Sequence, residues 1–154
     1  ELVISITSAG QLHPLGDQPS FALIDRALRD EGTSLHYQPP GTWSRLDPEI
    51  KHRIEPTLDE LSENIGIADS WTTDAPYRET AAAIAAATAA GASCVEMEAA
   101  ALYALAAAES RQVVCLAHLT NTMAVAGDDF EKGHANGVHA AMRVVAHVAA
   151  VAVT

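Results

Sequence analysis

The hydrophobic and polar positions follow two patterns along the chain. Compact apolar runs rich in β-branched residues predict strands over residues 2–7, 65–72 and 113–117. The small apolar run 92–95 predicts either a short buried strand or a tight entry to the next helix. Apolar positions at helical spacing and long alanine runs predict helices over residues 47–64, 79–90, 97–108 and 136–151. The segment 21–28 fits either state. Strands that alternate with helices indicate an α/β fold with a largely buried sheet.

Boundary residues sharpen several of these predictions. Asp47 is a suitable N-cap and Pro48 suits the first helical position, whereas Pro56 leaves open a division of the segment 47–64 into two. Gly91 is expected to end the helix over 79–90. Proline, glycine and acidic residues predict loops over 12–19, 39–41 and 123–133.

Charge and length narrow the class of protein. The 154 residues suffice for one domain, 1–154, with a real core. The net charge of −11 argues against a nucleic-acid polymer as partner, since binding a phosphate backbone needs clustered Lys and Arg. A nucleoside or mononucleotide remains allowed. The apolar stretch 138–153 is interrupted by Arg143 and His147, which favours a helix packed on the core over a membrane span.

The cysteines and histidines give no sign of a metal site. Cys94 and Cys115 stand in apolar contexts without metal-ligand spacing, so we expect buried thiols in a reducing compartment. The seven histidines are scattered, and His118 in an apolar strand is interpreted as a core residue. The chain opens on Glu1 and a strand-like run rather than a signal peptide, and we expect a cytoplasmic location.

Glu96-Met97-Glu98 stands at the start of the alanine-rich helix over 97–108. The two carboxylates lie two positions apart, so they do not share a helical face. One is expected to cap the first turn, where negative charge is favourable. The other can point elsewhere, for instance at ligand hydroxyls, because a carboxylate can accept from both donors of a sugar diol.

This tripeptide and four other segments resemble, in order, the motifs of the nucleoside phosphorylase family, which includes uridine phosphorylase and the hexameric purine nucleoside phosphorylases. The first segment, Ile6-Thr7-Ser8-Ala9-Gly10, resembles the family's strand followed by a phosphate turn. The other three segments are Gly32-Thr33-Ser34, Trp71 to Tyr77, and the strand over 113–119 followed by Thr120-Asn121. The resemblance implies a three-layer α/β sandwich, with a central mixed sheet flanked by helices. It also implies that this chain is the C-terminal portion of the family fold.

The resemblance further implies cleavage of the bond between ribose and base, with inorganic phosphate as co-substrate and no cofactor. The partners would be a nucleoside, phosphate and further copies of the chain in a homo-oligomer. The implied site residues are Glu96, Met97 and Glu98 for ribose, Thr7 and Ser8 for phosphate, Pro76, Tyr77 and Arg78 for the base, and Asn121 for leaving-group activation.

Three departures from the family pattern keep alternatives open. Ile4 stands where the family usually has a phosphate-binding Arg, which leaves a nucleosidase that uses water as one alternative. Asn121 cannot protonate a purine, and this favours a pyrimidine-like substrate or an atypical purine route. Thr122 replaces an Arg of the uridine branch. Arg78 can equally pair with Glu79 or Asp74. A non-catalytic nucleoside-binding domain is the remaining alternative.

Overall fold

The computed structural model describes residues 1–13, 21–122 and 137–153, except the side chains of residues 121 and 122. Its strands are β1 (Leu2–Gln11), β2 (Phe21–Asp30), β3 (Trp43–Arg45), β4 (Ile65–Thr73), β5 (Cys94–Glu96) and β6 (Gln112–Thr122). Its α-helices are α1 (Pro48–Ile54), α2 (Ala81–Ala90), α3 (Ala99–Glu109) and α4 (Val138–Ala152). Short 3-10 helices are η1 (Ser34–His36), η2 (Glu55–Glu60) and η3 (Pro76–Arg78).

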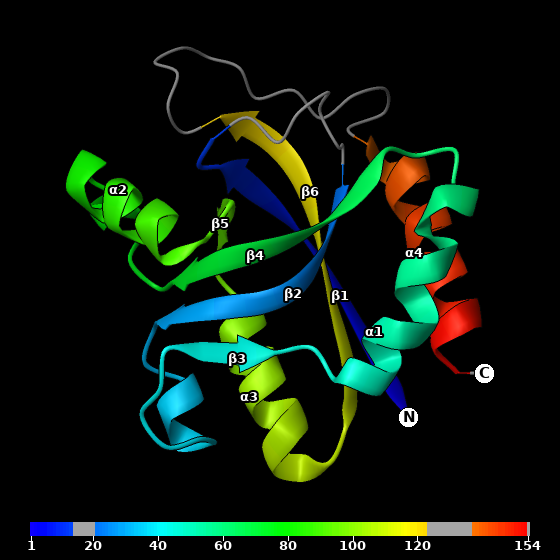
Figure 1. Ribbon diagram of the computed structural model, residues 1–154, viewed down its shortest axis with the longest axis horizontal. Coiled ribbons are helices and arrows are strands. Elements are labelled where there is room, and N and C mark those ends of the chain that lie inside the picture. The colour runs from blue at the N-terminus through cyan, green and yellow to red at the C-terminus, as the bar shows by residue number, and fades with distance from the viewer. Residues whose placement is uncertain (14–20, 123–136, 154) are drawn as a thin grey trace.

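The strands form one mixed sheet in the order β3-β2-β4-β5-β1-β6. β1 and β6, β2 and β4, and β4 and β5 run parallel, whereas β5 is antiparallel to β1. The start of β2 also pairs antiparallel with β6, so five of the strands close into a ring. Helices α1 and α4 lie together on one side, α3 packs under β2, β3 and β6, and α2 lies at the opposite edge (Figure 1). The predicted mixed sheet with flanking helices is confirmed.

Strand β6 runs through the main core. Residues Val113 to Ala117 are at most 4% exposed, and the expectation of a central strand there is confirmed. β1 is less buried than its sequence predicted, since residues 2–7 are half-buried or exposed. The reason is its pairing: β1 pairs with β6 along its whole length, but with β5 only at Gly10 and Gln11. Among the described residues, the other edge of β1 is therefore open over most of the strand.

The remaining elements resolve the ambiguities of the sequence. Residues 21–30 are a strand, so the helical spacing of their apolar residues is incidental. Asp47 caps α1 by accepting from the N–H groups of Glu49 and Ile50 at 2.8 and 3.2 Å. Pro56 lies in the first turn of η2, so the predicted helix does divide there. Gly91 ends α2 with a φ of +106°. The predicted loops over 12–19 and 123–133 fall almost entirely outside the described residues.

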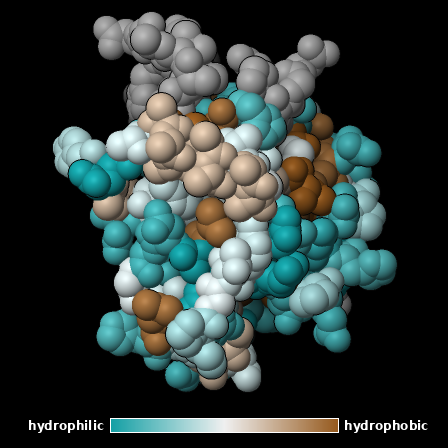
Figure 2. Space-filling view, turned by 60° about the vertical axis from the view of Figure 1, so that its left-hand side comes forward, coloured by the Kyte–Doolittle hydropathy of each residue, from teal (hydrophilic) through white to brown (hydrophobic). Residues whose placement is uncertain are grey.

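Helix α2 is covered mainly by small apolar side chains that face solvent. Figure 2 shows them as a pale brown band over this helix, in which Ala87 is the buried residue. Ala87 packs in a second, smaller core with Leu12, Trp71, Ala92 and Val95. This small core holds α2 against the ends of β4 and β5, next to the Glu96-Met97-Glu98 segment.

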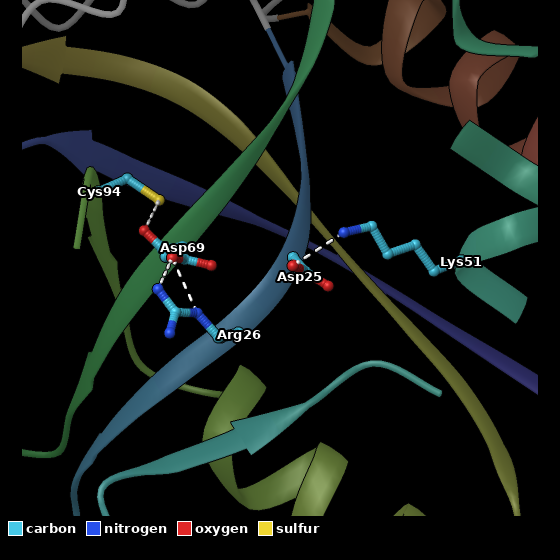
Figure 3. Close-up of polar contacts among 5 residues, drawn as sticks. All are labelled: Asp25, Arg26, Lys51, Asp69 and Cys94. Carbon is cyan, nitrogen blue, oxygen red and sulfur yellow. Dashed lines mark hydrogen bonds and ion pairs between the residues drawn. The ribbon is translucent and has the colours of Figure 1, made fainter. Parts of the chain in front are cut away.

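An irregularity in β2 sends two consecutive charged side chains to different partners (Figure 3). Asp25 pairs with Lys51 of α1 at 2.9 Å. Arg26 donates to Asp69 of β4, and its guanidinium lies 4.3 Å from the ring centroid of Trp43 in β3. All four charged side chains are partly exposed, so each ion pair contributes little to stability. Together these contacts tie β2 to its neighbours.

Cys94 and Cys115 are buried free thiols, as the sequence predicted. Burial raises the pKa of both thiols well above the ordinary range, so the reactive thiolate is scarce in the folded chain. We therefore expect Ellman's reagent to label neither cysteine in the folded protein and both after unfolding in urea. Rapid labelling of one thiol under native conditions would contradict this burial.

Candidate active site

Glu96 is the buried centre of the segment that joins β5 to α3. Its side chain is enclosed, with 4% of the residue exposed. Oε1 accepts hydrogen bonds from Ser70 Oγ at 2.9 Å and Thr72 Oγ1 at 2.5 Å. Oε2 accepts from the N–H groups of Glu98 and Ala99, both at 2.7 Å. Glu96 is thus the carboxylate that caps the first turn of α3, and its hydrogen-bonding capacity is used within the protein. This fits a supporting role rather than direct contact with a sugar.

Ser70 and Thr72 are site residues that the motif comparison missed. They lie two positions apart in β4, so both side chains point to the same face of the sheet. Thr72 Oγ1 also accepts from the N–H of Ala100 at 3.0 Å. Both residues are fully buried. The alternation Ser70-Trp71-Thr72 within an apolar strand was the available signal, because two buried hydroxyls on one face require a polar partner.

Burial raises the pKa of Glu96, and hydrogen bonds from Thr72, Ala99 and Glu98 offset part of this effect. The folded chain therefore holds the Glu96 proton more tightly than the unfolded chain does. This favours folding below the ordinary pKa of glutamic acid, and the contribution is lost as pH rises through the higher folded-state value.

We expect the stability of the wild-type chain to fall, relative to Glu96→Gln, as pH rises from about 4 to 7. The measurement is urea unfolding of both proteins across this range, since the amide of the variant does not titrate. A stability difference that is constant with pH, or that changes in the opposite direction, would contradict the raised pKa of Glu96.

Met97 and Glu98 face solvent beside this buried network. Met97 is 46% exposed, and the Glu98 side chain makes no capping bond to α3. The Glu98 carboxylate accepts from the Met97 N–H at 3.2 Å and keeps lone pairs for other donors. It stands at the N-terminal end of α3. The arrangement predicted from the sequence, with one capping and one outward carboxylate, is the one that the structure has.

Two other predicted motifs meet at the end of β4. The N–H of Gly32 donates to Asp74 Oδ2 at 3.1 Å, and Trp71 Nε1 donates to Asp30 Oδ2 at 2.9 Å. Trp71 is 3% exposed and belongs to the smaller core. These contacts fix the start of η3 against the segment Gly32-Thr33-Ser34.

The predicted base-binding residues form η3. Pro76, Tyr77 and Arg78 are all exposed, and Tyr77 is fully so. Arg78 forms no ion pair with any described residue, so the alternative pairing with Glu79 or Asp74 is not present. Among the described residues, no hydrogen bond joins η3 to Met97 or Glu98. The two groups are linked through β4, which holds Thr72 against Glu96 and leads directly into η3.

The predicted phosphate turn at Thr7 to Gly10 is wrong as local structure. β1 continues to Gln11, with Thr7 opposite Ala117 and Ser8 opposite His118 of β6. The long parallel pairing with β6 therefore overrides the turn tendency of these residues, apart from a register shift after Ala9. Thr7 is half-buried and Ser8 is exposed.

Asn121 lies near the end of β6, and its side chain is outside the described part of the structure. Its backbone position is informative. Gly10 of β1 pairs with Asn121 on one side and with Val95 of β5 on the other. Two strand spacings separate these neighbours, so Asn121 is about 10 Å from the residue that precedes Glu96. The fold thus brings the Asn121 position and the Glu96-Met97-Glu98 segment to the same end of the sheet.

The described ranges contain neither a metal-binding cluster nor a membrane-spanning helix. No group of three or more His, Cys, Asp or Glu residues there has the geometry to hold a metal ion. In the same ranges, no helix is both long and apolar enough to cross a bilayer.

The chain belongs to the phosphorylase superfamily, because the model of that family matches residues 1–152. A P. knowlesi homologue of P. falciparum PNP has the same fold, with a TM-score of 0.79 and 15% identity over 99% of this chain and 62% of the other. The AMP nucleosidase from Bacteroides thetaiotaomicron is also similar, with a TM-score of 0.69 and 19% identity over 95% of this chain and 60% of the other. This chain thus spans about three-fifths of each neighbour. No curated protein matches it.

Proposed function

We propose that this chain cleaves the N-glycosidic bond of a ribonucleoside, with inorganic phosphate as the acceptor and no cofactor. The observation that carries the proposal is the pairing of a buried, fully hydrogen-bonded Glu96 with an exposed Glu98 at the start of α3. In this pair Glu96 is held by the protein, and the Glu98 carboxylate is the one that can accept from a diol. Membership of the phosphorylase superfamily supports the reaction class.

Each proposed role follows from the charge that develops during cleavage, which leaves the ribose positive and the base negative. Glu98 accepts hydrogen bonds from two ribose hydroxyls, and Met97 packs on the sugar face. Tyr77 and Arg78, together with Pro76, contact the base, and Asn121 donates a hydrogen bond to it. Thr7 and Ser8 are the proposed contacts of the acceptor.

Hydrolysis is the second candidate, and a specific observation favours it. Ile4 is a half-buried apolar residue in β1, so it supplies no cation for phosphate, and Thr7 and Ser8 lie in a regular strand rather than in an anion-binding turn. One similar structure is named as an AMP nucleosidase. Water needs no such cation.

Product analysis separates the two reactions. The purified 154-residue chain is incubated with uridine and with inosine, with and without inorganic phosphate, and the sugar product is identified. Ribose 1-phosphate formed only with phosphate supports phosphorolysis, whereas free ribose at equal rates in both conditions supports hydrolysis. A parallel preparation of Glu98→Ala measures contaminating activity. Cleavage that does not exceed this background would overturn the proposed activity of the chain.

We further propose that the domain 1–154 is part of a longer family fold and works as a homo-oligomer in the cytoplasm. The support is the coverage of three-fifths of the similar structures and the two free buried thiols, which suit a reducing compartment. Light scattering of the purified chain measures its assembly. A monomer at concentrations where the chain is active would contradict the oligomer.

A further inference from the structure

One edge of strand β1 is open over most of its length. β1 pairs with β6 from Leu2 to Gln11, whereas β5 pairs with its other edge only at Gly10 and Gln11. No backbone hydrogen bond joins residues 2–9 to a described residue outside β6. In a parallel ladder, every second residue turns its N–H and C=O away from the partner strand. The open edge of β1 therefore offers a row of donors and acceptors to another strand.

This edge has none of the features that usually protect an edge strand. Residues 2–12 contain no charged side chain and no proline, and the irregularity of the strand comes only after Ala9. Leu2, Ile4 and Ile6 pack against the main core, while Val3 is 47% exposed. Residues 2–8 thus form an extended, uncharged edge that is suited to the addition of a strand.

Helix α4, which contacts β1, carries exposed apolar side chains. Its basic residues Arg143 and His147 bond to Glu63 and Thr57, in and just after η2. Three apolar residues that are 56–65% exposed lie on another side of the helix, and these are Val138, Met142 and Val153. They add apolar surface to the part of the molecule that holds the open edge.

Acidic residues are absent from both elements. The chain has 20 Asp and Glu residues, yet the 10 residues of β1 and the 15 residues of α4 include none of them. Two copies that each carry a net charge of −11 repel one another in most orientations. They approach at the lowest electrostatic cost where neither copy presents a carboxylate. This distribution favours a second copy as the occupant of the edge, since a basic partner would prefer an acidic face.

An extended edge strand is also its own complement. When two identical strands run antiparallel about a two-fold axis, the donors of each copy face the acceptors of the other. A pairing that uses the whole of residues 2–8 spans about 23 Å and is centred on Ser5. In this register Ser5 lies opposite Ser5 of the second copy.

We propose that two copies of this chain associate through antiparallel pairing of their β1 edges, with Ser5 at the two-fold axis. The pairing joins β6 and β1 of one copy to β1 and β6 of the other in one continuous sheet. The inference rests on the homo-oligomer proposed above, for which it specifies the interface, and it is independent of the proposed reaction.

Charges at position 5 test the interface directly, because each substituted residue faces its own copy. Sedimentation equilibrium of the wild-type chain should show a dimer with a dissociation constant below about 100 µM. Ser5→Asp and Ser5→Lys each place like charges opposite one another, and each should weaken the dimer at least about fivefold. An equimolar mixture of the two variants should associate at least as tightly as the wild type.

The possible failures of this test are distinguishable. A wild-type chain that is monomeric at about 100 µM would overturn both this interface and the proposed homo-oligomer. A dimer that neither variant weakens, or that the mixture does not restore, would overturn this interface alone.

Cysteine cross-linking tests the register without placing a charge at the half-buried Ser5. Ser5→Cys puts two thiols across the axis with their Cβ atoms about 4.5–5.5 Å apart, close to the separation in a disulfide. Cys94 and Cys115 are buried and do not compete. Mild oxidation should link most of Ser5→Cys into dimers, while Ser62→Cys, at an exposed position outside β1, should stay monomeric. Equal cross-linking of the two variants would contradict the register.

Amide hydrogen exchange separates a second copy from any other occupant of this edge. The N–H groups of residues 2–8 that turn away from β6 should become protected as protein concentration rises, in step with the dimer. Full protection at concentrations where the chain is monomeric would show that the edge is occupied within one copy, and this would overturn the proposal.

Discussion

Replacing Glu98 with alanine is expected to lower kcat/KM for a ribonucleoside by about 100- to 1,000-fold, the equivalent of about 3–4 kcal/mol. The loss arises because two charge-assisted hydrogen bonds to the ribose hydroxyls disappear. Folding should be almost unaffected, since the exposed carboxylate accepts only one hydrogen bond, from the adjacent Met97 N–H. Steady-state kinetics and urea unfolding measure the two effects.

The matched control is Glu109→Ala, an exposed acid at the other end of the same helix. It removes the same charge from α3 and should leave kcat/KM within about twofold of the wild-type value. A Glu98→Ala enzyme as active as this control would show that Glu98 does not hold the sugar. A large loss of stability in Glu98→Ala would contradict the assignment of the structural role to Glu96.

Replacing Glu96 has the second large effect, and here the effect is on folding. Glu96→Ala leaves the hydroxyls of Ser70 and Thr72 and two backbone N–H groups without their acceptor. We expect a loss of about 3–5 kcal/mol in the free energy of unfolding, because buried donors without partners are costly. Urea unfolding at neutral pH measures it.

Glu96→Gln is the variant to compare with Glu96→Ala. The amide oxygen can accept from the N–H groups of Glu98 and Ala99, while the amide nitrogen donates to the hydroxyls of Ser70 and Thr72, which can rotate to accept. The expected loss is therefore smaller, about 1–2 kcal/mol. Two results would contradict the proposed support of α3 by the buried network. One is an equal loss of unfolding free energy in Glu96→Ala and Glu96→Gln, and the other is a loss in both that is no larger than for a surface substitution.

Much of the fold was predictable because local patterns and tertiary structure agree. The caps at Asp47 and Gly91 and the apolar run at Val113 to Ala117 all specify locally what the fold requires. The segment 21–28 stayed ambiguous, since its apolar residues satisfy both periods. This segment forms a strand because it pairs with β4 and β6, and the sequence of the segment alone does not show this non-local pairing. The same reason explains β1, where pairing with β6 replaces the turn that Thr7 to Gly10 suggested.

The residue types of the candidate site could be predicted, but the separate roles of Glu96 and Glu98 could not. The spacing of Glu96 and Glu98 implied two directions for two carboxylates, yet nothing local says which one is buried. The choice depends on Ser70 and Thr72, 26 and 24 residues from Glu96, whose hydroxyls meet it only after β4 and β5 pair.

The most direct test of the central claim, that Glu98 binds the ribose hydroxyls, is a binding cycle measured by calorimetry. Uridine and 2′,3′-dideoxyuridine are titrated into the wild-type chain and into Glu98→Ala. The account predicts that the wild type prefers uridine by at least about 100-fold and that the variant binds both equally weakly. A variant that keeps the wild-type preference for uridine would contradict the account, because the hydroxyls would then be recognised by another group.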